Sequence, residues 1–106
     1  MDEKVLEISF NIIGCAGDAK GLAMEAIKLA KSGNIVEARE KIEESRQGMV
    51  QAHKYQTQLV HAEANGEKTE MSVILVHAQD HLMTSMTFQQ LADEIIDVYA
   101  RLEEQK

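Results

Sequence analysis

The chain has 106 residues, which is enough for one domain, and it is short of large side chains, with two Phe, two Tyr and no Trp or Pro. The formal net charge is −7 and the 11 basic residues form no cluster, which argues against binding to a nucleic acid backbone. The single cysteine excludes an internal disulfide framework. Apolar runs are too short to span a bilayer and no signal-peptide core opens the chain, so we expect a cytoplasmic protein without membrane insertion.

The first periodic segment, residues 3–31, has apolar residues at alternating spacings of three and four, which predicts a long amphipathic helix. Its seam includes Cys15, which we expect to be inert core. A parallel row, Phe10, Gly14, Gly17 and Gly21, is nearly bare of side chains. Each glycine inside a helix costs up to about 1 kcal/mol relative to alanine. The row is therefore expected to admit a neighbouring helix, with a flexible break or the floor of a site as the alternative.

The second periodic segment, residues 35–64, predicts a second helix, whose apolar seam becomes polar in its later half at Ser45, His53 and Gln56. Gly33 is expected to close the first helix, and Asn34 to cap the second through a capping box with Glu37. Residues 65–68 form a second turn signal.

The third segment predicts a helix over residues 70–103, with Thr69 as its N-cap. Short connections between three long helices favour an all-α, antiparallel up-down-up three-helix bundle. At 100° per residue one stripe of the third helix contains Ile74, His77, His81, Thr84, Phe88, Leu91, Ile95, Val98 and Leu102. Other apolar residues lie off this stripe, and three helices cannot bury them all. We therefore predict a homo-oligomer with the third helix at its interface.

Two histidines and an aspartate, His77, Asp80 and His81, lie within five residues of this apolar segment. Their place on or beside the stripe predicts that they face a packed surface. There an unpaired polar group costs roughly 1–3 kcal/mol unless it is compensated. Such a cluster is expected to have a specific role.

The two histidines could belong to a metal site, to a catalytic triad or to a site of phosphoryl transfer. His77 and His81 have the spacing of a zinc pair, but Ala78 stands where metalloproteases carry Glu. A di-iron bundle needs a second cluster, and a catalytic triad lacks a credible nucleophile. Imidazole is largely neutral and nucleophilic near neutral pH, so a histidine that accepts a phosphoryl group remains. Gln79, His81 and Thr84 are candidate donors to the phosphoryl oxygens.

Asp80 raises a separate question, because copies of it would converge if third helices met around a symmetry axis. Carboxylates at close range must share protons or bind a cation, and a hard ion such as Mg²⁺ suits oxygen ligands.

The run Val76-His77-Ala78-Gln79-Asp80-His81-Leu82-Met83-Thr84 resembles the enzyme IIA component of the bacterial phosphoenolpyruvate-dependent sugar phosphotransferase system, in its lactose/cellobiose/chitobiose family. Further support comes from Ala52-His53, Gln56-Thr57 and Ala16-Gly17-Asp18-Ala19 upstream. The resemblance covers nearly the whole chain. It implies one domain over residues 1–106, a cytoplasmic homotrimer of three-helix subunits, and a phosphotransferase activity that uses a phosphohistidine intermediate.

The resemblance also implies partners and residue roles. A phosphoryl group would pass from the phosphocarrier HPr to His77 and then to a cysteine of the IIB component, which phosphorylates a disaccharide at the membrane IIC component. Three copies of Asp80 would share one divalent cation, with Mg²⁺ expected. From their own chemistry, Gln79 and His81 are candidates to stabilise the phosphoryl group, with a structural hydrogen bond as the alternative for His81. His53 and Gln56 would face the site or be structural.

The resemblance implies a sugar of the cellobiose, chitobiose or lactose type, and Ala78 with Ser85-Met86 is closer to members of the first two kinds. The alternative hypothesis is a non-enzymatic trimeric helical module, used for interaction or metal binding. In that case the His/Asp cluster only fixes the register of the trimer or holds a structural metal.

Overall fold

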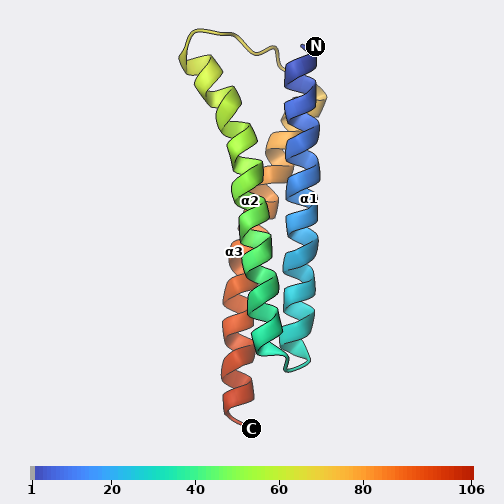
Figure 1. The fold of residues 1–106 in the computed structure, drawn as a ribbon, viewed down its shortest axis with the longest axis vertical. Coiled ribbons are helices and arrows are strands. Elements are labelled where there is room, and N and C mark those ends of the chain that lie inside the picture. The colour runs from blue at the N-terminus through green and yellow to red at the C-terminus, as the bar shows by residue number, and fades with distance from the viewer. Residues whose placement is uncertain (1) are drawn as a thin grey trace.

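The computed structural model describes residues 2–106 as three helices, α1 (Glu3–Lys31), α2 (Ile35–Ala64) and α3 (Val73–Glu104). They form an elongated up-down-up bundle of 57 × 20 × 17 Å, in which α3 runs parallel to α1 (Figure 1). This stretch contains no strand, so the predicted all-α three-helix architecture is confirmed. None of the helices within residues 2–106 is both long enough and apolar enough to cross a membrane.

Both predicted glycine turns are confirmed, because each glycine adopts a positive φ just after a helix. Gly33 has φ +88°, and its N–H donates to the Ala30 carbonyl at 3.0 Å. The next N–H, of Asn34, reaches back to the Leu29 carbonyl at 2.9 Å. These two bonds satisfy the last carbonyls of α1 in a Schellman motif. Gly66, with φ +87°, ends α2 in the same way.

Two predicted helix starts need correction. The Asn34 side chain makes no capping hydrogen bond, so the expected capping box of α2 does not form. α3 begins at Val73 rather than near residue 70, because Ser72, not Thr69, is its N-cap. The Ser72 hydroxyl accepts from the Leu75 N–H at 3.2 Å. The far end of α2 leans away from α1 (Figure 1). Residues 67–72 have no regular secondary structure and span the distance from there to the start of α3.

α1 packs closely on both other helices because its inner face is mostly alanine. The residues concerned are Ala16, Ala19, Ala23, Ala26 and Ala30, all buried. The Ser45 hydroxyl donates to the Ala19 carbonyl at 2.5 Å. One turn further along α2, a Cβ atom on Gly48 would lie only 3.0 Å from Cβ of Ala19. This contact was not predicted from the sequence, although a glycine inside a helix, as at Gly48, indicates a close approach of another helix.

α3 carries two apolar faces, and only one of them packs within the subunit. The packed face consists of Leu75, Ala78, Leu82, Ser85, Gln89, Ala92 and Ile96. The other face leaves large apolar residues exposed, namely Val73, Val76, Met83, Leu91, Ile95, Val98 and Leu102, and we call this set the outer face of α3. Much of the stripe predicted from the sequence to be packed lies on this exposed side. The stripe is therefore not packed within one subunit, and its burial against other copies of the chain stays a prediction.

Candidate functional site

His77 and His81 lie one turn apart on α3 and form the centre of the candidate site. Their rings are stacked with centroids 6.0 Å apart and an interplanar angle of 10°. His77 is exposed and His81 is half-buried, so the pair lies at the surface of the subunit instead of facing its core. Within residues 2–106 neither imidazole forms a hydrogen bond. The backbone carbonyl of His81 accepts one from the Thr84 hydroxyl at 3.3 Å. An exposed imidazole without a fixed partner is free to act as a nucleophile.

Of the two histidines, His81 lies at the edge of α3 that faces α1. A Cβ atom on Gly17 would lie 3.4 Å from Nε2 of His81. Gly14 and Gly21, one turn away in either direction, have no atom within 4 Å of such a Cβ. The expected close approach along the glycine row is therefore confirmed at Gly17 only. Which glycine meets α3 could not be read from the spacing, because all three share it.

Gln79 points away from the histidines. Residues two apart on a helix are separated by roughly 200°, so Gln79 and His77 lie on nearly opposite sides of α3. The Gln56 amide on α2 donates to the Gln79 side-chain oxygen at 2.5 Å. The structure thus joins two predicted site residues, Gln56 and Gln79, to each other, but brings neither to the His77 of the same subunit.

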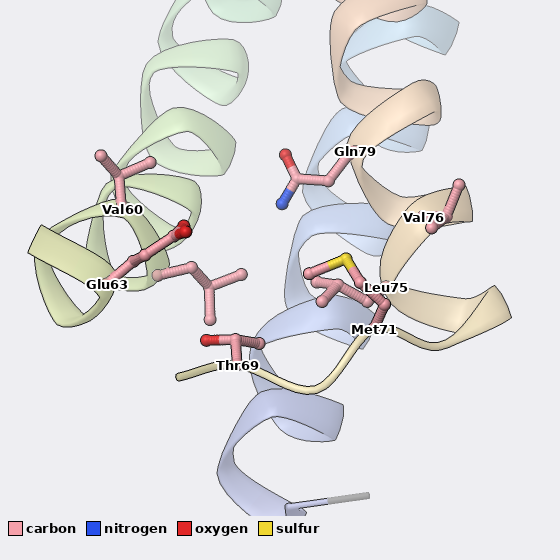
Figure 2. Close-up of a pocket in the computed structure, with 8 residues that line it drawn as sticks. Val60, Glu63, Thr69, Met71, Leu75, Val76 and Gln79 are labelled. Carbon is pink, nitrogen blue, oxygen red and sulfur yellow. The ribbon is translucent and has the colours of Figure 1, made fainter. Parts of the chain in front are cut away.

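The Gln79 side chain lines an apolar groove of about 310 Å³ at the open end of the bundle. Figure 2 shows it reaching from α3 toward the last turns of α2, with the 65–72 connection below. The groove is lined by Leu59, Val60, Glu63, Thr69, Met71, Leu75 and Val76 as well. This groove opens on the α2 side of α3, away from the stacked histidines.

The two other histidines lie on α2. His53 lines a second groove between α2 and α3 of about 330 Å³, together with Met49 and Met86. Its Nδ1 is 3.5 Å from the Thr57 hydroxyl. His61 is exposed near the end of α2, as expected. Within one subunit, His53 is therefore not part of the His77 site.

Asp80 is exposed and lies among the apolar residues of the outer face of α3. Its side chain forms no ion pair within the described part of the chain, although the Asp80 carbonyl accepts from Thr84 at 2.9 Å. No group of three possible metal ligands occurs among residues 2–106 of one subunit. A carboxylate is a suitable ligand for a hard divalent cation. Asp80 fits such an ion only if further ligands come from other copies of the chain.

Cys15 is half-buried and packs against the core cluster that contains Ile12 and Ala16. Burial, and to a smaller degree the Asp18 carboxylate, raise the pKa of its thiol. A raised pKa lowers the thiolate fraction at neutral pH, so the thiol is a poor nucleophile. This agrees with the structural role expected from the sequence.

The fold and the site together describe a small three-helix bundle with an exposed imidazole on its third helix. Residues 7–100 match the family model described as "PTS system, Lactose/Cellobiose specific IIA subunit". The chain therefore belongs to the lactose/cellobiose family of phosphotransferase system IIA subunits. The family resemblance inferred from the sequence is confirmed.

Individual relatives agree with this assignment. The lichenan-specific phosphotransferase enzyme IIA component of Bacillus subtilis is 48% identical over 106 residues, which cover 100% of this chain and 96% of that protein. The crystal structure of a cellobiose-specific enzyme IIA from Bacillus anthracis is similar with a TM-score of 0.95 and 44% identity, covering 100% of this chain and 97% of that one. The IIA(chitobiose) in a complex with HPr from Escherichia coli has a TM-score of 0.81 and 37% identity, with 93% and 96% of the two chains covered.

Proposed function

We propose that this protein is a phosphohistidine carrier in the uptake of a disaccharide of the cellobiose, chitobiose or lactose type. The observation that carries the proposal is the exposed, unbonded imidazole of His77, in a chain that belongs to the IIA family. The proposed donor is phospho-HPr, supported by the complex of the chitobiose relative with HPr. Donor and carrier would meet in the cytoplasm.

Two displacements at phosphorus make up the proposed reaction. A ring nitrogen of His77 attacks the phosphoryl group of phospho-HPr, so a P–N bond to His77 forms while the bond to HPr breaks. In the second step a cysteine thiolate of the IIB component attacks the same phosphorus. The P–N bond then breaks, a P–S bond forms, and the His77 imidazole is regenerated. His81, stacked one turn away, is the nearest candidate donor to the phosphoryl oxygens.

The proposed assembly is a homotrimer that buries the outer face of α3. The seven large apolar residues of this face are otherwise exposed, which is unusual for a monomer of this size. Three copies of Asp80 would then meet near the axis and share one divalent cation, Mg²⁺ being the expected ion. Asp80 would hold the cation, and the cation would neutralise the converging carboxylates and fix the register of the trimer.

Phosphoryl transfer can be tested with phosphoenolpyruvate, enzyme I and HPr as the donor system. The wild type is expected to gain the mass of one phosphoryl group in an acid-labile linkage. His77→Gln should gain none, whereas His61→Gln, which changes an exposed histidine elsewhere, should behave as the wild type. A wild type that gains no mass, or a His77→Gln variant that still gains it, contradicts the proposal. The first result would favour the non-enzymatic trimeric interaction or metal-binding module.

A further inference from the structure

The orientation of His81 depends on packing alone. Its ring nitrogens make no hydrogen bond with any residue between 2 and 106. One face of the ring is stacked on His77, with centroids 6.0 Å apart. Its Nε2 edge points to α1 at Gly17. A ring held by one stacking partner and one edge contact is sensitive to either of them, because no directional bond restores it.

Among Gly14, Gly17 and Gly21, only Gly17 has an atom of another helix within 4 Å of an added Cβ. A Cβ atom there would be 3.4 Å from Nε2 of His81, which is the near limit of ordinary van der Waals contact. A methyl group is therefore just tolerated, and we expect atoms beyond Cβ to displace the His81 ring. Glycine inside a helix costs roughly 0.5–1 kcal/mol relative to alanine, so its presence at this point calls for a compensating role.

We propose that Gly17 is a positioning residue of the phosphoryl-transfer site, because it leaves room for the His81 ring and so keeps that ring stacked on His77. The proposal rests on the function proposed above for His77. A branched side chain at position 17 would displace the Nε2 edge, tilt the His81 ring and remove the surface against which His77 is stacked. Gly17 would act only through His81 and would not itself touch the phosphoryl group.

The substitution series follows from the distances. Gly17→Val places methyl groups in the space of His81, whereas Gly17→Ala adds only the tolerated Cβ. Gly21→Val is the matched control, because it makes the same change on the same row where no atom lies within 4 Å. We expect Gly17→Val to slow single-turnover transfer from phospho-HPr about tenfold or more, since small misplacements in a reacting site have effects of this size. Gly17→Ala and Gly21→Val should stay within about twofold of the wild type.

A spectroscopic measurement separates positioning from a general loss of structure. Nitrogen-15 spectra of the imidazoles should show shifted His81 and His77 resonances in Gly17→Val and unchanged ones in Gly21→Val. Circular dichroism and sedimentation should be the same for both variants. If valine prevents folding, Gly17→Leu replaces it, because leucine is also larger than alanine but has a higher helix propensity.

The His81→Ala background tests whether Gly17 acts through His81. Adding Gly17→Val to His81→Ala should lower the transfer rate no further, because the displaced ring is already absent. An additive loss, or an unaltered rate and unaltered imidazole spectra in Gly17→Val alone, overturns the proposal. If even the wild type accepts no phosphoryl group, the proposed function fails. The imidazole spectra still decide whether Gly17 positions His81.

Discussion

The Gln56 side chain donates a hydrogen bond to the Gln79 side chain at 2.5 Å and so joins α2 to α3 beside an apolar groove. Both amides are half-buried, so each needs a partner once water is partly excluded. This bond explains why Gln79, a neighbour of His77 in the sequence, is occupied elsewhere in the subunit. It also connects α3 to the later half of α2, whose far end leans away from α1 (Figure 1).

We expect Gln56→Ala and Gln79→Ala each to lower the free energy of unfolding by about 1 kcal/mol, because each leaves one half-buried amide unpaired. The double variant should lose much less than the sum, since its two partners are both absent. Urea unfolding of the four proteins measures this coupling. Fully additive losses would mean that the amides do not interact in solution.

The outer face of α3 is predicted to mediate self-association. Val98→Glu places a charge on this face at a residue that is 58% exposed in the subunit, and it should shift the sedimenting species from trimer to monomer. Val36→Glu is the matched control, because Val36 on α2 is 73% exposed and lies outside that face. It should leave the trimer intact. If both variants sediment as trimers, the interface does not involve the outer face of α3 at Val98.

Asp80 is predicted to hold the cation without being needed for assembly. Asp80→Leu makes the outer face of α3 more apolar and removes like charges that would meet at the axis, so the variant should remain a trimer and associate at least as tightly. It should no longer retain a divalent cation. Sedimentation together with elemental analysis of the dialysed protein tests both statements. Metal retained by the variant would exclude Asp80 as the ligand.

Gly48 is predicted to be essential to the contact between α1 and α2. A Cβ atom on Gly48 would lie 3.0 Å from Cβ of Ala19, so Gly48→Ala forces the helices apart despite its better helix propensity. We expect Gly48→Ala to lower the free energy of unfolding by about 1–3 kcal/mol, as measured by thermal unfolding. Gly21→Ala meets no atom within 4 Å and should instead stabilise the protein by roughly 0.5–1 kcal/mol. The opposite signs are the diagnostic result.

Cys15 is predicted to react slowly with iodoacetamide at about pH 8, because only the thiolate reacts and the pKa of this thiol is raised by burial and by Asp18. The rate should rise as the pH increases toward the raised pKa. In the urea-unfolded chain the same rise should occur at lower pH. Coincident pH profiles for the folded and unfolded chains would show that the fold does not perturb the thiol.

Local patterns in the sequence were sufficient to predict the helices and their turns. The apolar periodicity predicted α1 and α2 with the bounds that the structure shows. Gly33 and Gly66 were predictable because only glycine readily adopts the positive φ that ends both helices. The start of α3 was missed, because Thr69 and Ser72 are both capable caps and only the path of the chain between helices selects Ser72.

The tertiary structure decided which apolar face of α3 packs inside the subunit. Both faces repeat with the period of a helix, so periodicity cannot separate them. The packed face contains Ala78, Ser85 and Ala92, whose small side chains allow close approach to the alanine face of α1. The outer face lacks such residues and stays exposed. The sequence alone thus placed His77, Asp80 and His81 on one helix. Only packing decided that His81 meets Gly17, that Gln79 turns to Gln56, and that Asp80 remains on the outside.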